Sequence, residues 1–478
     1  MTTMPSTLVQ QLAHFTEQTA FADLPPEVVR ECKRILLDSI GCAVAATEEM
    51  KGRAGILYGQ QLAAVGPQAT IFGTAHRVSP LGAAYANGEL INTLDMDAVL
   101  PPGHVSPYVL PGAVAVAESL GASGQRLIEA VALSHEMSNR IGKAMDYLRD
   151  TKDGKVNPPK IFGYSSTVFG ATAAIGKVKG FSAATLADAL GIAGCVAPVN
   201  SQVAWFQHAP SSTIKYLHAG VLVQSAFTSA LMAEFGHRGD VQVLDDREYG
   251  FPRFIGTVKW EPEHITSGLG QEWRFPAEAS YKPYPHCRIL HALLDVLGEI
   301  IDTHRIRPDE IDGIKVYVEG MVEQPVWLNR RIEHVHDAQF SIAHGIALGA
   351  HRVPAGKAWM DPALVFGESV MGLMDRVTHE VHPDYVKLLT SQGASRPAKL
   401  ELRARGQTFV GEKRFPKGSP SPDPDTALTD DELIAKFRHN AEGVLTSAQA
   451  DQLVEMTMNL ERVDNVADLV RQAARVPA

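Results

Sequence analysis

The hydrophobic pattern of this chain changes twice along its length, and these changes limit the folds open to it. Up to about residue 265, apolar residues recur at helical spacing, as in the segment after Pro25-Pro26, where prolines suit the first turn of a helix. Further on, Ile314, Val316 and Val318 alternate with polar neighbours, which is typical of a strand with one buried face. From about residue 416 the helical spacing returns. The pattern predicts a mainly α chain with an α+β unit in its middle.

Several elements are predicted within these regions. The glycine-rich segment 170–176 favours a helix packed closely against its neighbours; a phosphate-binding loop is the alternative, but the GK[ST] residues of that motif are missing. After the turn-rich linker 418–424, Thr429 and Glu432 form a capping box, and we expect the tail that they open to pack back onto the first helical part. The other predicted elements are helices over 112–120, 127–141, 289–301 and 338–348, and a hairpin of 400–404 with 408–414 around Arg405-Gly406-Gln407.

Composition excludes several classes of function. A length of 478 residues predicts two or three domains, and a formal net charge of −10 argues against a nucleic-acid binder, which needs a basic face. The four cysteines are unclustered, which argues against a zinc ribbon or an iron–sulfur cluster and fits free thiols in a reducing compartment. The sequence shows neither a secretory signal nor an apolar run long enough to span a membrane, so we expect a cytoplasmic protein without membrane contact.

Acid–base candidates gather in one loop. Asp95 and Asp97 flank Met96, and His104 follows the Pro/Gly segment 101–103. A carboxylate beside an imidazole orients the ring and raises its basicity, which suits proton abstraction. The alternative is structural, with an Asp that caps a turn and a His on the surface.

Cationic candidates come from two later segments. Lys215 lies among apolar residues, where a buried ammonium needs an anion, although most lysines are solvated. Lys282, His286 and Arg288 project from a segment stiffened by two prolines, and Arg288 precedes a predicted helix, whose exposed amides favour anions. This segment also fits a linker between domains, and the two interpretations are compatible because clefts form at domain boundaries.

A further charged pair is Glu136 with Arg140, four residues apart on a predicted helix. We interpret it as an ion pair on a solvated face.

Five motifs in order carry a family resemblance that covers most of the chain. They are LLDSIGCAVAA near the start, AAYANGELINTLDMDA followed by His104 and VLPGA, SSTIKYLHAG, SYKPYPHCRILH, and the tail from KGSP to LTDDELIAKFR. In this order they resemble the MmgE/PrpD family of 2-methylcitrate dehydratases and cis-aconitate decarboxylases. The resemblance implies a large all-helical domain of residues 1–265 and 416–478, and a smaller, lid-like α+β domain of residues 266–415 inserted between its parts. It also implies a homodimer without cofactor or metal that acts on a small citrate-like or aconitate-like polycarboxylic acid.

The resemblance also assigns roles to individual residues. Asp95 and His104 match the catalytic loop of the family, and Lys215 and Lys282 match its two active-site lysines. We expect the catalytic residues to be Asp95, His104, Tyr164, Lys215 and Lys282, and the substrate-binding residues to be Ser166, His286 and Arg288.

The chain departs from the family pattern in two of these segments. The family loop often reads Asp-x-Asp-Asp-Thr, whereas Ala98 and Val99 follow Asp97 here. Tyr164 stands where the family often has a His, and a tyrosine donates a proton but is a poor base, because its ordinary pKa is about 10. These changes leave the natural substrate open.

The residues together predict a hydro-lyase that acts by α-proton abstraction. In this hypothesis His104, oriented by Asp95, moves the proton, Lys215, Lys282 and Arg288 hold the carboxylates, and Tyr164 or a lysine protonates the leaving oxygen. Decarboxylation or epimerisation would pass through the same enolate-like intermediate, so both stay open. An alternative from another class is a non-catalytic dimeric relative, which would have no reason to bring these residues to one pocket.

Overall fold

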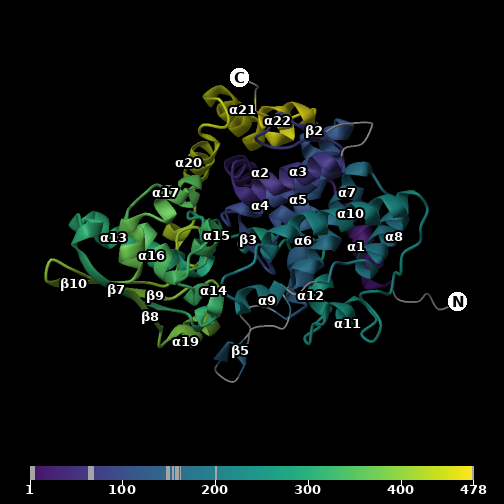
Figure 1. The fold of residues 1–478 in the computed structure, drawn as a ribbon. Helices are drawn as coiled ribbons and strands as arrows, with labels where there is room; N and C mark the ends of the chain where they lie inside the picture. The colour runs from purple at the N-terminus through teal and green to yellow at the C-terminus, as the bar shows by residue number, and fades with distance from the viewer. Residues whose placement is uncertain are drawn as a thin grey trace.

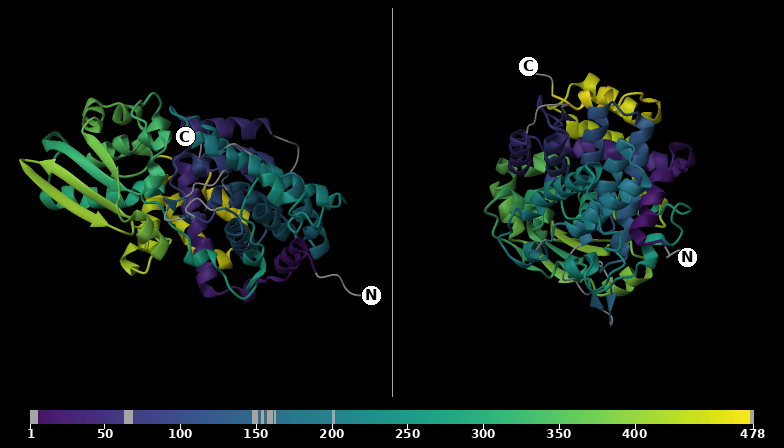
Figure 2. Two further views of the ribbon diagram at one scale, coloured as in Figure 1. Left: turned by 90° about the horizontal axis from the view of Figure 1, so that it is seen from below. Right: turned by 90° about the vertical axis from the view of Figure 1, so that its right-hand side faces the viewer.

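The protein is described by a computed structural model that covers residues 6–62, 69–146, 151–152, 155–156, 161, 163–199 and 202–475. Figure 1 and the left view of Figure 2 show a helical part beside a smaller part that contains the larger sheet, which has four strands. The architecture is therefore mainly α with some β, as the pattern predicts. No helix of the described residues is both long and apolar enough to cross a membrane.

The helices that precede the sheet are α1 (Leu8–Gln18), α2 (Pro26–Ala45), α3 (Met50–Gln61), α4 (Pro80–Thr93), α5 (Ser106–Leu120), α6 (Gly124–Lys143), α7 (Thr167–Lys179), α8 (Ala183–Cys195), α9 (Gln202–Gln207), α10 (His218–Glu234), α11 (Phe251–Ile255) and α12 (Glu263–Thr266). The short strands among them are β1 (Ala69–Thr70), β2 (Arg77–Val78), β3 (Val99–Leu100), β4 (Gly103–His104), β5 (Thr151–Lys152) and β6 (Lys155–Val156). Three 3₁₀ turns carry residues discussed below: η2 (Gly163–Ser166), η3 (Ile214–Leu217) and η5 (Arg288–Leu290).

The later helices are α13 (His291–His304), α14 (Pro325–Leu328), α15 (Val335–Ala338), α16 (Ile342–Ala350), α17 (Pro362–Val365), α18 (Glu368–Met374), α19 (Tyr385–Ser391), α20 (Asp430–Ala441), α21 (Ser447–Met458) and α22 (Val466–Gln472). The strands of the larger sheet are β7 (Ile311–Val318), β8 (Val377–Val381), β9 (Ala398–Ala404) and β10 (Gln407–Lys413).

The small residues of α7 allow two helices to approach closely. A Cβ atom added at Gly170 would lie 2.4 Å from the Ser134 carbonyl oxygen of α6, closer than real Cβ atoms come. The predicted close packing of segment 170–176 is therefore confirmed, and the segment lies inside a buried helix rather than in a phosphate-binding loop.

The four-stranded sheet has the order β10-β9-β7-β8, with β7 and β8 parallel and the other neighbours antiparallel. Ile314, Val316 and Val318 are buried on β7, as their alternation predicts. The predicted hairpin forms with a turn of Arg405 and Gly406 alone, because Gln407 already pairs with Ala404. Helices α13 and α16 pack against this sheet (Figure 1).

The C-terminal tail returns to the helical part of the molecule. Thr429 accepts a hydrogen bond from the Glu432 amide at 3.2 Å, and the Glu432 carboxylate accepts from the Thr429 amide at 2.8 Å, which confirms the capping box. Helices α20 and α21 pack on α2, and α22 packs on α5 (Figure 1). Phe437 of α20 lies against Gly41 of α2, where a Cβ atom would approach its ring to 3.0 Å.

The pair of Glu136 and Arg140 forms, but its setting differs from the prediction. Both side chains have 0% exposure, and Arg140 Nε donates to Glu136 Oε1 at 2.6 Å. The guanidinium also donates to carbonyls of segment 265–272, and Glu136 accepts from the Arg274 and Phe275 amides. The pair is buried because that segment folds over α6, which the helical spacing alone does not reveal.

Candidate functional site

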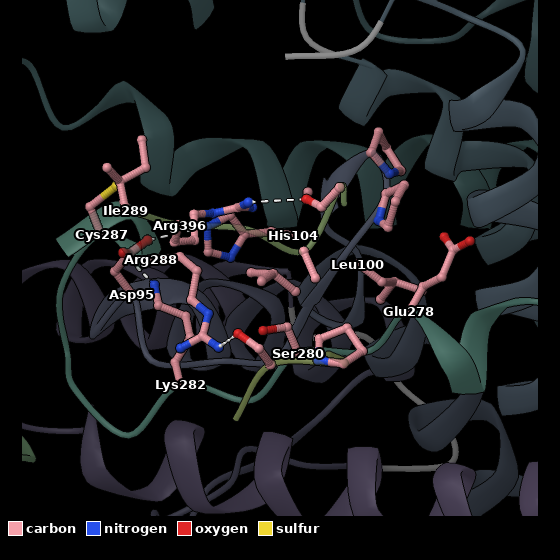
Figure 3. A pocket seen from close by; sticks show the side chains of 18 of the residues that line it. Asp95, Leu100, His104, Glu278, Ser280, Lys282, Cys287, Arg288, Ile289 and Arg396 are labelled. Carbon is pink, nitrogen blue, oxygen red and sulfur yellow. Dashed lines mark hydrogen bonds and ion pairs between the residues drawn. The ribbon is translucent and has the colours of Figure 1, made fainter. Parts of the chain in front are cut away.

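A cavity of about 400 Å³ is lined by residues of the helical part together with residues that precede the sheet, connect its strands and follow it (Figure 3). Its lining includes all five residues expected to be catalytic, namely Asp95, His104, Tyr164, Lys215 and Lys282. They come from the loop after α4, from β4, η2 and η3, and from the segment before η5. Residues separated by up to 187 positions therefore meet in one space.

Asp95 is the point at which the two lysines meet. It follows the end of α4 with a φ of 50°, in the left-handed region that Asp tolerates better than most residues. Lys215 Nζ donates to Asp95 Oδ1 at 2.7 Å, and Lys282 Nζ donates to Asp95 Oδ2 at 2.6 Å. Burial alone would raise the pKa of Asp95, but Lys215 and Lys282 outweigh it and hold the pKa well below its usual range. The site thus contains a buried carboxylate bound by two ammonium groups.

His104 lies between two carboxylates. Its strand β4 pairs with β3 in a short hairpin, which turns the ring toward the Asp95 loop. His104 Nδ1 is 2.8 Å from Asp97 Oδ2, and His104 Nε2 is 3.2 Å from Asp95 Oδ1. Asn92 Nδ2 donates to the other Asp97 oxygen at 3.1 Å. A proton on either ring nitrogen therefore has an acceptor, which is a suitable arrangement for an acid–base group.

The orientation of His104 differs from the sequence-based hypothesis, which gave this role to Asp95 alone. Asp97 holds the Nδ1 side of the ring, while Asp95 also binds two lysines. Asp97 was part of the predicted loop but was not selected as a site residue. Its spacing of two from Asp95 was the available signal, but only the fold of the loop assigns each carboxylate its partner.

The loop that carries both carboxylates is fastened by two distant elements. Lys436 of α20 donates to Asp38 Oδ1 at 2.6 Å and to the Met96 carbonyl oxygen at 2.8 Å. Asp38 of α2 also accepts from the Ala98 amide at 3.0 Å. The C-terminal tail thus supports the site directly, which the sequence did not indicate.

Tyr164 lies against the backbone of the His104 hairpin. A Cβ atom at Gly103, whose φ is 152°, would lie 2.3 Å from the Tyr164 ring, so only glycine permits this contact. The Tyr164 and His104 ring centroids are 6.2 Å apart in an edge arrangement. Tyr164 is therefore near the acid–base group, on a wall of the same cavity.

The three predicted substrate-binding residues differ in whether they line the cavity. Arg288 lines the cavity, but its guanidinium donates to the Lys417 carbonyl oxygen at 2.8 Å and to Ser419 Oγ at 2.7 Å (Figure 3).

His286 and Ser166 are not among the described residues that line the cavity. Burial lowers the pKa of His286 to about 3, and its ring packs on Gly345 of α16, where a Cβ atom would come within 2.3 Å. Ser166 Oγ donates to the Gly163 carbonyl oxygen at 2.5 Å within its own turn.

The rest of the lining adds residues that sequence reasoning missed. Trp205, Trp327 and Phe340 form an apolar wall, and Lys143 pairs with Glu278 on another side. Desolvation raises the pKa of the Cys287 thiol to about 11, so it faces the cavity as a neutral group. Aromatic residues far apart in sequence look like ordinary core residues, so no local signal marked them.

Among the residues that the structure describes, no three His, Cys, Asp or Glu side chains are grouped so that they could hold a metal ion.

Comparison with known proteins identifies relatives for nearly the whole chain. The profile of the MmgE/PrpD N-terminal domain matches residues 10–263, and that of the MmgE/PrpD C-terminal domain matches residues 284–462. A cis-aconitate decarboxylase-like protein, oryM, from Aspergillus oryzae is 24% identical over 96% of both chains. The human cis-aconitate decarboxylase is 25% identical over 93% of this chain and 90% of its own. A cis-aconitate decarboxylase from Aspergillus terreus is 26% identical over 62% of this chain and 60% of its own.

Proposed function

Because the chain belongs to the MmgE/PrpD family, we propose that it is a lyase that acts on a citrate-like or aconitate-like carboxylic acid by making a carbanion next to a carboxylate. One observation carries the proposal: two lysines, a histidine and Asp95 meet in one cavity. Such a carbanion is stabilised as an enolate, which needs positive charge fixed in advance near its oxygens. Lys215 and Lys282 supply that charge, and His104 moves the proton.

Elimination of water is the first candidate reaction. His104 takes the α-proton, and the electron pair of the C–H bond moves into the adjacent carboxylate to form the enolate. The pair then forms the carbon–carbon double bond as the β carbon–oxygen bond breaks, and the leaving oxygen takes a proton from Tyr164 and departs as water. Solvent returns a proton to Tyr164 and removes one from His104. Tyr164 suits the acid role because it lies near His104 on a wall of the same cavity. In this role it only has to donate a proton, while His104 acts as the base.

Loss of carbon dioxide is the second candidate, and the relatives named cis-aconitate decarboxylases favour it. In this reaction the bond to one carboxylate breaks, and carbon dioxide leaves without the bonding pair. The pair remains as an enolate of another carboxylate, and protonated His104 delivers a proton to carbon. Both reactions use the same two lysines and the same histidine.

Proton NMR in heavy water tests the proposal and separates the candidates. We expect one member of a panel of citrates, aconitates, malate-type acids and tartrates to react. A new alkene signal would indicate dehydration, a product one carbon shorter would indicate decarboxylation, and α-deuteration alone would indicate epimerisation. If neither the acids of the panel nor their alkyl-substituted members gave a new signal or incorporated deuterium, the proposal would be refuted and a non-catalytic relative would remain.

Variants connect the reaction to the site. With the substrate found above, we expect His104→Gln to lower kcat by about 10²–10⁴-fold, the usual contribution of a positioned acid–base group. Lys215→Met should also reduce kcat strongly, whereas Lys387→Met, on an exposed helix, should not. Wild-type turnover in both site variants would show that the chemistry lies elsewhere.

A further inference from the structure

A loop between helix α19 and strand β9 brings to the cavity a cation that the proposed mechanism does not use. Residues 392–394 and Arg396 of this loop line the cavity. Figure 3 shows the Arg396 side chain apart from the contact between Lys282 and Asp95. The sheet-containing part of the chain therefore supplies a positive charge at a place of its own.

The other cations of the cavity lining are already engaged by the protein. The two site lysines bind Asp95, and Lys143 pairs with Glu278. Arg288 donates from one terminal nitrogen to a backbone carbonyl oxygen and from the other to Ser419. These contacts leave few free donors on these four residues.

The guanidinium of Arg396 differs in having a free donor. It forms no ion pair with a carboxylate of the described residues. Its Nη1 donates to the Ser395 carbonyl oxygen at 2.9 Å and to the Gly393 carbonyl oxygen at 3.3 Å. Its Nε is buried and its Nη2 is not, and neither makes a hydrogen bond within the part of the chain that the structure describes. Arg396 thus offers a positive charge and an accessible N–H group at Nη2.

The loop that carries this guanidinium is fixed before any ligand binds. Arg414, just after β10, donates from Nε to Ser395 Oγ at 2.9 Å and from Nη2 to the Leu388 carbonyl oxygen at 3.0 Å. The Arg414 carbonyl oxygen accepts from the Arg396 amide at 2.8 Å. A carboxylate that meets a cation held in this way forms a charge-assisted hydrogen bond at a low cost in ordering.

We propose that Arg396 binds a terminal carboxylate of the substrate, away from the reacting carbon, and so selects acids that carry this additional carboxylate. The inference rests on the proposed function for the chemistry at His104 and the two lysines. It adds the residue that recognises the far end of a citrate-like or aconitate-like acid. If Arg396 only supported its own loop, its loss would weaken all acids alike.

Two unreactive saturated acids test this selection by calorimetry. Tricarballylate has three carboxylates, and methylsuccinate is the same acid without one terminal carboxylate. We expect tricarballylate to bind the wild type at least tenfold more tightly, which is the usual scale of a hydrogen bond between charged groups. Equal affinities, or no binding of tricarballylate, would overturn the inference.

Variants locate the preference at Arg396. Arg396→Gln should abolish the preference for tricarballylate and leave the affinity for methylsuccinate unchanged, and Arg396→Lys should retain part of the preference because the charge remains. Arg403→Gln, at an exposed residue of β9 outside the cavity lining, should bind both acids as the wild type does. Equal weakening of both acids in Arg396→Gln, or a preference that survives there, would contradict the inference.

A measurement on the wild type needs no variant to fold. Phenylglyoxal modifies accessible arginine side chains, and peptide mass spectrometry locates the products. Tricarballylate should protect Arg396 from modification, whereas methylsuccinate should not, and neither acid should protect Arg403. Absence of modification at Arg396, or modification that tricarballylate does not slow, would contradict an accessible carboxylate-binding group.

Kinetics separate this inference from the proposed lyase. With the substrate found by NMR, Arg396→Gln should raise KM by about tenfold with little change in kcat, because the contact is made equally before and during the reaction. An unchanged KM on a citrate-like acid would keep the lyase and refute the role of Arg396. A tricarballylate preference that depends on Arg396, without turnover of any acid in the NMR panel, would refute the lyase and keep the ligand assignment.

Discussion

At the scale of single residues, the site depends on how each charged group is shared. Asp95 divides its two oxygens between Lys215 and Lys282, so neither lysine is buried without an anion. Asp97 instead holds the Nδ1 side of His104. Two carboxylates two positions apart therefore have different tasks, one setting the charge of the site and the other the orientation of the ring.

This division predicts the effect of Asp97→Asn. The amide retains the shape of the side chain but removes the charge that faces His104, so we expect kcat to fall by about 100-fold, within the range for positioned acid–base groups. KM should change little, because Asp97 is not among the described residues that line the cavity. Steady-state kinetics on the substrate found by NMR measures both constants, with Asp312→Asn on the surface as the matched control. A rise in KM alone would assign Asp97 to substrate binding.

At the scale of elements, helices whose residues do not line the cavity hold the site in place. Helix α4 carries Asn92 and leads into Asp95, and Glu89 of the same helix accepts a hydrogen bond from the Gly220 amide at 2.7 Å. That amide belongs to the first turn of α10, directly after the η3 turn that bears Lys215. The contact thus fixes the distance between the Asp95 and Lys215 segments.

Lys436 of α20 provides a test of support from the tail. Lys436→Met removes the hydrogen bonds to Asp38 and to the Met96 carbonyl oxygen, so we expect the 95–98 loop to loosen and kcat to fall at least tenfold, as misplacement by about 1 Å is costly. Circular dichroism should show the helices retained. The exposed Lys387→Met serves as the control, and unchanged kcat in a folded Lys436→Met variant would show that the loop is positioned without the tail.

Glu89 leads to a prediction about how the stability of the protein depends on pH. Burial raises the pKa of Glu89 from 4.5 to about 8 although the Gly220 amide opposes the shift. Between these values the folded protein keeps a proton that the unfolded chain has lost, so this group makes stability fall as pH rises from about 4.5 to 8. At about 1.4 kcal/mol per pKa unit, we expect a loss of roughly 3 kcal/mol between pH 5 and pH 8 from this group.

Urea unfolding of Glu89→Gln at both pH values measures that contribution. The variant keeps an acceptor for the Gly220 amide but cannot ionise, so its stability should decline less with pH than that of the wild type. Glu299→Gln, an exposed carboxylate on α13, should decline as the wild type does. Parallel curves for Glu89→Gln and the wild type would mean that Glu89 ionises normally.

At the scale of the whole molecule, buried charge links segments that the sequence separates. The Glu136–Arg140 pair joins α6 to segment 265–275, which leads to the Lys282 segment of the site. The tail α20–α22 joins the end of the chain to its beginning. The proposed domain boundaries near residues 265 and 416, the homodimer, the cytoplasmic location and the absence of a cofactor stay predictions.

Removing one partner of the buried pair should be far costlier than removing one partner of an exposed pair. Arg140→Leu leaves Glu136 buried without its cation, and we expect a loss of about 3–5 kcal/mol in the free energy of unfolding. Arg53→Leu breaks the pair with Glu48, whose two side chains are 61% and 66% exposed, and about 1 kcal/mol or less is expected there. Urea denaturation of both variants gives the comparison, and similar losses would show that burial does not govern the cost.

The sequence by itself determined the elements and the main candidates of the site. Helical spacing, the alternation on β7, the capping box at Thr429 and the hairpin at Arg405 are local patterns, so they could be predicted without tertiary contacts. Short motifs likewise selected Asp95, His104, Lys215 and Lys282, although their roles stay proposals.

Only the tertiary structure decided how these residues are partnered. It assigned Asp97 rather than Asp95 to His104 Nδ1, placed His286 away from the cavity lining, and brought Lys436 to the 95–98 loop. It also gathered Trp205, Trp327 and Phe340 into one wall. The physical reason is common to all of them: partners and burial depend on contacts between residues far apart in the chain, and a local pattern contains no information about which distant side chain will face it.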